Sequence, residues 1–259
     1  MDSENDGNAA YELISRLARI PDMRQRGYAL ALRLRTRDDE FVLGVIALIW
    51  DEALKGEEDF LRLYNGLLVP GVLLGVLGKE RISNLVEAAR VRGQAELVAI
   101  LHDFPSEHEP DTYHQPYLDG ALREAPLGMR KSLARKPDFK MISRIARDQD
   151  HRVIENLLSN PRLTERDVVR IAAVRPISPK VLEVIYKHPR WMTRYSVKKT
   201  IVLNPHSPLS IALRLLAFLN PADLEEVSSS QELHPDLVQE AWRILEKKNQ
   251  SPEQEWTIF

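Results

Sequence analysis

The sequence predicts an all-α protein in which a helical N-terminal domain precedes an α-solenoid, a stack of short helical units that share one core. Apolar residues recur at helical spacing along nearly the whole chain, and the alternation of apolar and polar residues that marks strands is missing. From Gly128 onward, prolines recur at intervals of about one short helix and its turn. The prolines at 161, 176, 189, 205, 221 and 235 are separated by 15, 13, 16, 16 and 14 residues. Part of this region also repeats itself in register.

The N-terminal region contains a series of candidate helices. In AAYELISRLARI, the residues Leu13, Ile14, Leu17 and Ala18 share one helical face before Pro21 ends the run. Further helices are expected over 23–36, 40–54, 57–67, 79–91 and 93–103.

Two apolar stretches in this region are candidates for core helices. They are FVLGVIALIW (Phe41–Trp50) and LLVPGVLLGVLG (Leu67–Gly78), and both are shorter than the roughly 20 residues that a membrane span needs. We therefore expect buried helices and no membrane span. The spaced glycines Gly71, Gly75 and Gly78 are expected to favour close helix packing.

The segment DFPSEHEPDTYHQPYLDG, Asp103 to Gly120, has no helical period and is rich in Pro and Asp, which favours a connector. The predicted organisation is a disordered N-terminus at 1–8, a helical domain at 9–103, the connector at 104–120, the helical-repeat region at 121–249 and a tail at 250–259.

The prolines of the C-terminal half predict where helices end and begin. A proline pushes the residue before it out of the α region, so an X-Pro step ends a helix. Thr164, Ser178 and Ser207 follow such steps and are expected to cap the next helices. Thr164 with Asp167 resembles a capping box, and Pro179 and Pro208 are expected in first helical positions.

The internal repeat appears when the chain is shifted by 44 residues. RVIENLLSNPRLT (152–164) then overlays SVKKTIVLNPHSP (196–208), and Asn160–Pro161 coincides with Asn204–Pro205. Such self-similarity is typical of stacked helical units that bury a continuous core. We expect the two Asn-Pro steps in equivalent turns of successive repeats.

The stretches 146–185 and 194–216 resemble bacterial helical-repeat proteins of the leucine-rich-repeat-variant and armadillo/HEAT-like kinds. The resemblance is carried by a V-x6-N-P-x2-[T/P] frame at Val153–Thr164 and at Val197–Pro208. It covers about residues 125–245 and implies armadillo/HEAT-like repeats, but no particular function. The iron–sulfur cluster of one variant-repeat protein needs cysteines that this chain lacks, so that feature is not carried over.

Composition and motifs exclude several kinds of chemistry. The chain has no Cys, which rules out disulfides, thiolate nucleophiles and Cys-bound zinc or iron–sulfur clusters, and which fits a cytoplasmic location. The acidic start MDSENDGN does not resemble a signal peptide. The dinucleotide-binding, Walker A, H-E-x-x-H and nucleophile-elbow motifs are missing. We therefore expect that the protein holds no cofactor and is not an enzyme.

One group of titratable residues lies in the connector, where His102, His108 and His114 occur among Asp and Glu. Imidazole and carboxylate together can hold a divalent metal. A Pro-rich connector lacks the rigid surroundings that a metal site needs, so we expect a solvated loop and no metal.

The charges are distributed unevenly along the chain. Residues 121–214 carry 20 Lys/Arg against 8 Asp/Glu, a net +12, whereas residues 1–120 carry a net −8 and residues 215–259 a net −6. A helical core does not require this asymmetry, and ordinary surfaces intersperse both signs. A basic middle therefore indicates a surface for phosphate or for an acidic protein.

The candidate partner-binding residues form two basic clusters. Guanidinium groups fork onto carboxylates or phosphates, and aromatic rings add flat contact area. The first cluster is Arg190, Trp191, Arg194, Tyr195, Lys198 and Lys199. The second contains the candidate contact residues Arg130, Lys131 and Arg135, together with Lys136, Lys140, Arg144 and Arg147.

The leading expectation for function is a non-enzymatic scaffold or adaptor whose basic face binds a protein partner with an acidic surface. The alternative is a nucleic-acid-binding repeat protein, including a DNA glycosylase of the HEAT-like kind, although no catalytic acid is identifiable. Two further interpretations stay open. The basic face could dock on the chain's own acidic N-terminal region, with Trp191 and Tyr195 packing between repeats, or it could simply be solvated.

Overall fold

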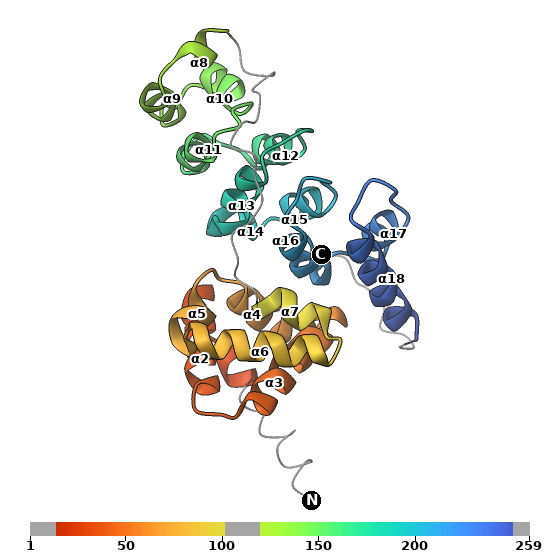
Figure 1. Cartoon of the computed structure of the whole chain (residues 1–259). Coiled ribbons are helices and arrows are strands. Elements are labelled where there is room, and N and C mark those ends of the chain that lie inside the picture. The colour runs from red at the N-terminus through yellow and green to blue at the C-terminus, as the bar shows by residue number, and fades with distance from the viewer. Residues whose placement is uncertain (1–13, 102–119, 251–259) are drawn as a thin grey trace, which may run out of the picture. The chain divides into compact units, whose positions relative to one another are not determined.

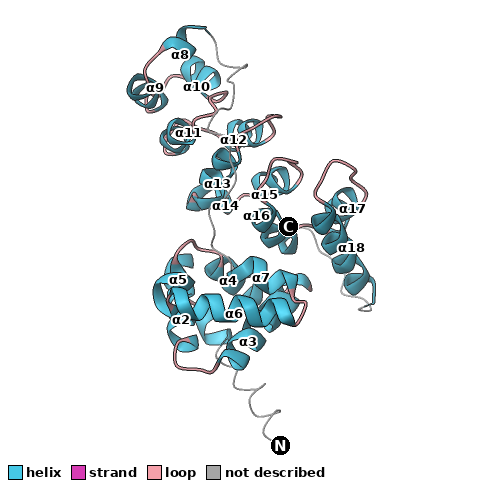
Figure 2. Cartoon of the chain, viewed as in Figure 1, coloured by secondary structure: helices cyan, strands magenta, loops and turns pink. Residues whose placement is uncertain are grey.

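The computed structural model describes residues 14–101 and 120–250, and every regular element within these ranges is a helix (Figure 1 and Figure 2). The predicted all-α fold is confirmed for this part of the chain, which contains no strand. The predicted N-terminus at 1–8, the connector up to residue 119 and the tail from residue 251 lie outside the described residues.

Residue contacts divide the chain into two compact units. In unit 1, residues 14–18 are helical, and the further helices are α2 (Met23–Leu34), α3 (Asp39–Leu54), α4 (Glu58–Leu67), α5 (Val72–Leu77), α6 (Lys79–Val91), α7 (Ala95–Leu101), the 3₁₀ turn η1 (Leu216–Phe218), α17 (Pro221–Ser228) and α18 (Pro235–Gln250). Unit 2 contains α8 (Gly120–Glu124), α9 (Leu127–Ala134), α10 (Phe139–Ile145), α11 (His151–Leu158), α12 (Glu165–Ala172), α13 (Pro179–Lys187), α14 (Pro189–Met192), α15 (Tyr195–Val202) and α16 (Leu209–Leu215).

This division differs from the predicted one, which ran the C-terminal domain to residue 249. Helices α17 and α18 belong to unit 1 together with the N-terminal helices. The rings of Tyr64 and Phe218 lie 5.4 Å apart, and Lys247 Nζ lies 3.1 Å from Asp51 Oδ1. The sequence could not show this, because the apolar stripe of an amphipathic helix does not specify which core it joins.

The core of unit 1 is built around α3, which contacts α4, α6, α7 and η1. This helix contains the apolar stretch 41–50, and its residues Val42, Ile46 and Ile49 are fully buried, as predicted. Helices α2 and α4 approach so closely that a Cβ on Gly27 would lie 2.2 Å from the carbonyl oxygen of Gly66. Only glycine fits at this crossing.

The close packing predicted for Gly71, Gly75 and Gly78 is wrong. Gly71 and Gly78 flank α5 with φ angles of 77° and 85°, a backbone conformation that glycine adopts without strain. A Cβ on Gly75 would approach only the Tyr28 hydroxyl, at 3.8 Å. Gly71 and Gly78 therefore begin and end a short helix, and Gly75 lies within it.

Two of the three predicted caps, Thr164 and Ser178, begin helices of unit 2. The predicted cap Ser207 is wrong, because its hydroxyl donates to the Ile201 carbonyl and Pro208 directly precedes α16. Thr164 and Asp167 form the predicted capping box of α12, and Pro179 occupies the first turn of α13 after Ser178. Helix α16 begins at Leu209, one residue later than predicted. In Figure 1, α9, α11 and α13 follow one another, in agreement with the contacts of α11 with both neighbours.

The turn after α11 is held by the buried side chain of Asn160. Its Nδ2 donates to the carbonyl oxygens of Ala134 and Lys136, at 2.8 and 2.9 Å, where α9 ends. Its Oδ1 accepts from the backbone N–H of Arg162 at 3.0 Å. One side chain therefore closes its own turn and binds the end of a neighbouring helix.

Asn204 makes the same set of bonds after α15. Its Nδ2 donates to the carbonyl oxygens of Ala172 and Val174, at 2.7 and 3.1 Å, where α12 ends, and its Oδ1 accepts from His206 N–H at 2.9 Å. Pro161 and Pro205 both follow in the turn, outside any helix. The predicted equivalence of the two Asn-Pro steps at a spacing of 44 residues is confirmed. We call each of these turns with its bonds an asparagine frame.

Replacing Asn160 or Asn204 by Ala should destabilise unit 2, because two carbonyl groups lose their donors at positions that water reaches poorly. We expect each change to lower the free energy of unfolding by about 1–3 kcal/mol. Urea unfolding followed by far-UV circular dichroism measures this loss. The control Asn84→Ala, at the exposed surface of α6, should stay within about 0.5 kcal/mol of wild type. Wild-type stability of the Asn160→Ala protein would contradict the structural role of the frame.

Candidate partner-binding site

Two turns of unit 2 and the segment 188–194, which contains α14, are joined by hydrogen bonds and carry exposed basic residues. The turn after α9 is joined to the turn after α11 through Asn160, and the Arg162 guanidinium lies 5.3 Å from the centre of the Phe139 ring. The third segment, 188–194, reaches the same turn, because Arg190 Nη2 donates to the Leu163 carbonyl at 3.2 Å. We call the exposed Lys and Arg residues of these segments the basic edge: Arg135, Lys136, Arg162, Arg190 and Arg194.

The structure separates the residues of the predicted cluster Arg130, Lys131 and Arg135. The side chain of Arg130 is 12% exposed, and its Nη1 lies 2.5 Å from Oδ2 of Asp148, whose side chain is fully buried. Burial raises the pKa of Asp148, although the ion pair with Arg130 opposes this shift. Arg130 thus belongs to a buried ion pair, and its prediction as a contact residue is corrected.

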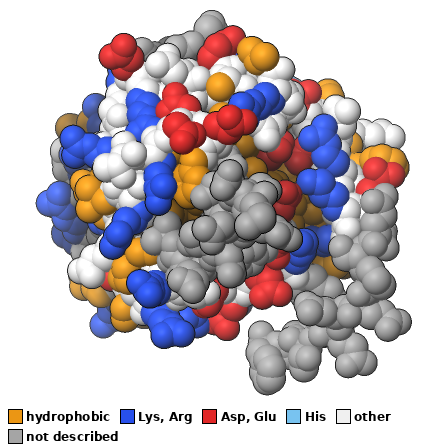
Figure 3. Space-filling view, turned by 90° about the horizontal axis from the view of Figure 1, so that it is seen from below, with side chains coloured by type: hydrophobic (Ala, Val, Ile, Leu, Met, Phe, Trp, Pro, Cys, Tyr) orange, Lys and Arg blue, Asp and Glu red, His pale blue; other side chains and the backbone are white. Residues whose placement is uncertain are grey.

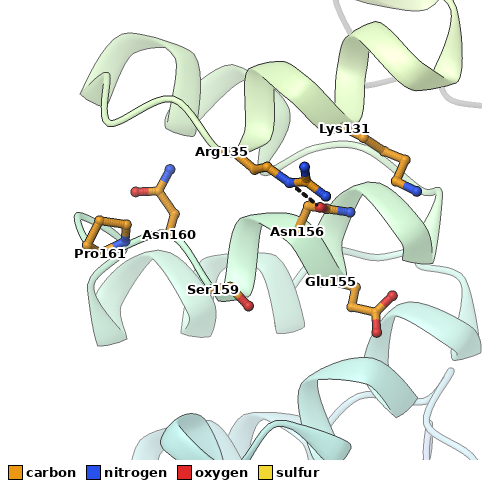
Figure 4. Close-up of a pocket in the computed structure, with 7 residues that line it drawn as sticks. All are labelled: Lys131, Arg135, Glu155, Asn156, Ser159, Asn160 and Pro161. Atoms are coloured by element: carbon orange, nitrogen blue, oxygen red, sulfur yellow. Dashed lines mark hydrogen bonds between the residues drawn. The ribbon is translucent and has the colours of Figure 1, made fainter.

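Lys131 and Arg135 instead line a groove of about 600 Å³ between α9 and α11 (Figure 4). They form the α9 side of this α9–α11 groove. The other side comes from α11 and its turn, namely Glu155, Asn156, Ser159, Asn160 and Pro161. Arg135 Nε donates to Asn156 Oδ1 at 2.7 Å across the groove.

The first predicted cluster, within residues 190–199, is partly at the surface. Arg190 is exposed and its guanidinium lies 4.2 Å from the centre of the Trp191 ring. Arg194 precedes α15, with its Nε 3.8 Å from Glu165 Oε2, and Tyr195 is 41% exposed. Lys199 is half-buried. Arg190, Arg194 and Tyr195 therefore remain available to a partner.

Trp191 and Lys198 do not belong to this surface. Trp191 is 1% exposed, and its Nε1 donates to the Leu158 carbonyl at 2.9 Å, where α11 ends. The interpretation that Trp191 packs between helical units is therefore the right one. Lys198 is 7% exposed, and the shift of 44 residues aligns it with the core residue Ile154. The repeat itself thus carried the signal that Lys198 points inward.

The sequence reasoning missed Asn156 and Arg162. Arg162 directly follows Asn160–Pro161, so its place in a turn between two basic clusters was a usable signal. Asn156 gave no signal, because its partner Arg135 belongs to another helix and no local pattern links the two.

Acidic residues accompany the basic edge. Glu165 and Asp167 lie in the first turn of α12, where their negative charges interact favourably with the positive end of the helix dipole. Glu165 also faces Arg194. Charges of both signs also occur away from the basic edge: on the face seen from below in Figure 3, Lys, Arg, Asp and Glu are interspersed, as on ordinary surfaces. A ligand of the basic edge therefore meets several cations with a few carboxylates beside them.

Metal and membrane sites are not found in the described part of the chain. No three His, Cys, Asp or Glu side chains within 14–101 and 120–250 are grouped so that they could hold a metal ion. The histidines His102, His108 and His114 lie outside the described residues. No helix in the same ranges combines the length and the apolar character needed to cross a membrane.

Comparisons with known proteins give no match for this chain: no family model fits it, and no curated protein and no solved structure is significantly similar. Any function must therefore be inferred from the geometry of the site.

Lys198→Met should give a gain in stability that depends on pH. Burial lowers the pKa of Lys198 from the ordinary 10.5 to about 8. Between these values the unfolded chain binds more protons than the folded one, so the wild-type protein becomes more stable as pH rises from 8 to 10.5. The variant should be more stable by about 1–3 kcal/mol at pH 7 and should lose this advantage toward pH 10.5.

Urea unfolding of both proteins across this pH range measures the difference. Subtraction of the wild-type curve removes the contribution of other groups, including Lys248, whose pKa burial also lowers to about 8. Lys199→Met, at the half-buried neighbouring position, serves as the control. A gain from Lys198→Met that is constant with pH would contradict the assignment.

Proposed function

We propose that the protein is a non-enzymatic scaffold whose unit 2 is an α-solenoid of armadillo/HEAT-like repeats that binds an acidic surface of a protein partner. The two asparagine frames support the solenoid, because stacked repeats make the same contacts at each level. The cytoplasmic location suggested by the absence of Cys is part of the same proposal.

The observation that carries the binding function is the convergence of the basic edge. Cations from these three separate segments come together because Asn160 and Arg190 join the segments by hydrogen bonds to backbone carbonyl groups. Exposed charges add little to folding stability, so stability alone does not account for their gathering. Arg162 and Arg194 present guanidinium groups, which bind carboxylates through paired hydrogen bonds.

Nucleic acid is the second candidate, favoured by the net charge of +12 over 121–214. Non-specific binding of single strands relies on exposed aromatic side chains on which bases stack; Trp191 is buried, whereas Tyr195 and Phe139 are exposed. Carboxylates also lie beside the cations, with Glu165 at the basic edge and Glu155 in the α9–α11 groove. A regularly charged phosphate backbone would be repelled by these carboxylates, whereas a protein surface can match them.

Charge reversal at Arg162 and Arg194 tests the basic edge without removing a hydrogen bond to the backbone. We expect the double variant Arg162→Glu/Arg194→Glu to bind an Asp- and Glu-rich fluorescent peptide about tenfold more weakly than wild type, because two attractions become repulsions. Its melting temperature should stay within about 4 °C of wild type. Fluorescence anisotropy over a salt series measures the binding.

The matched control is Arg123→Glu/Arg147→Glu, which makes the same change in net charge at exposed positions outside the three segments of the basic edge. Equal loss of binding in both double variants would mean that only the overall charge matters. A labelled DNA duplex, tested in parallel, separates the two candidates. Tighter binding of the duplex, with a steep decrease as salt increases, would favour the nucleic-acid function.

A further inference from the structure

The α9–α11 groove carries two cations on its α9 side, and Glu155 of α11 adds a carboxylate that is directed away from α9. We propose that the groove binds a mixed-charge peptide segment of the partner. An acidic side chain of this segment contacts Arg135 and Lys131, and a neighbouring basic side chain contacts Glu155 (Figure 4). This inference rests on the proposed scaffold function and specifies the chemistry that one part of the surface recognises.

Arg135 is oriented before any ligand binds. Its Nε donates to Asn156 Oδ1 at 2.7 Å, and Asn156 is itself fixed, because its Nδ2 donates to the Arg152 carbonyl at 2.6 Å. The two Nη amino groups of Arg135 have no partner among the described residues. A planar guanidinium held at Nε presents this pair of amino groups as a fork that matches a carboxylate.

Lys131 adds a second cation on the same side. It lies one helical turn before Arg135, half-buried in the groove wall, and its ammonium group has no ion pair within the described part of the chain. Like charges at this spacing destabilise a helix by a few tenths of a kcal/mol. A carboxylate between them would offset that repulsion and would meet the donors of both side chains.

Glu155 lies on the other side of the groove. Figure 4 shows that its carboxylate points away from α9, whereas the Asn156 amide points toward it. Glu155 is exposed and forms no ion pair with any described residue. This carboxylate disfavours a ligand that is negative throughout and favours one that places a Lys or Arg beside its acidic residue.

The second asparagine frame shows that folding does not require these polar residues. Asn204 binds Ala172 and Val174 as Asn160 binds Ala134 and Lys136. Counted from these shared bonds, Lys131 and Arg135 correspond to Val169 and Ala173. In the 44-residue register, Glu155 and Asn156 correspond to Lys199 and Thr200. The same frame thus forms with a different set of side chains around it, and the charged groove is specific to the first copy.

The test compares two labelled peptides on a Gly/Ser framework in the full-length protein. One carries only Asp, and the other pairs each Asp with a Lys. Wild type should prefer the mixed peptide. Glu155→Gln should reduce this preference about threefold, as expected for one exposed ion pair. Arg135→Lys, which keeps the charge but loses the fork, should weaken binding of both peptides about tenfold.

Arg147→Lys is the matched control, an exposed position outside the groove, and should bind both peptides as wild type does. Circular dichroism and melting curves verify that each variant is folded. Wild-type binding by Arg135→Lys, or an unchanged preference in Glu155→Gln, would overturn the groove assignment. If Arg162→Glu/Arg194→Glu still weakens peptide binding in that case, the scaffold function stands without the groove. If no acidic peptide binds the wild-type protein, the scaffold function itself is wrong.

Discussion

Unit 2 depends on how short helices satisfy the carbonyl groups at their ends. The last carbonyls of every helix lack partners within that helix. Helices α9 to α12 have only seven or eight residues each, so much of their backbone lies at an end. Asn160 and Asn204 meet this demand because a primary amide offers two donors and an acceptor in one short side chain. A buried apolar residue would leave the carbonyls without partners, and a buried charge would add a desolvation cost.

Other buried polar side chains work in the same way, each joining segments that are distant in sequence. Trp191 donates to the Leu158 carbonyl, and Gln149 Oε1 accepts from Ser178 N–H at 2.8 Å. In unit 1, Arg26 donates to the carbonyl oxygens of Ile20, Pro21 and Arg62. Because hydrogen bonds are directional, these contacts fix positions that apolar packing alone would leave adjustable.

The sequence predicted what is determined locally. The predicted helices 23–36 and 79–91 correspond to α2 and α6 closely, because Pro, Gly and capping residues act within a turn or two. The prediction of Trp191 as a contact residue was wrong because α14 has only four residues, too few for the sequence to show which side of the helix faces inward. The partners of Asn160 lie more than twenty residues upstream, so its Pro neighbour predicted the turn but not the bonds. The pairing of Arg135 with Asn156 is equally non-local and became visible only in the structure.

Asn160 connects the stability of the fold with the geometry of the α9–α11 groove. It lies at one end of the groove, and its bond to the Lys136 carbonyl fixes the backbone immediately after Arg135. Asn156 then fixes the direction of the guanidinium, so a ligand would meet a group that loses little freedom on binding. Asn204 fixes the backbone at Val174 in the same way, but Val169 and Ala173, which precede Val174, carry no charge. The frame therefore repeats while the charged side chains around it do not, which explains why the repeat was visible in the sequence and the groove was not.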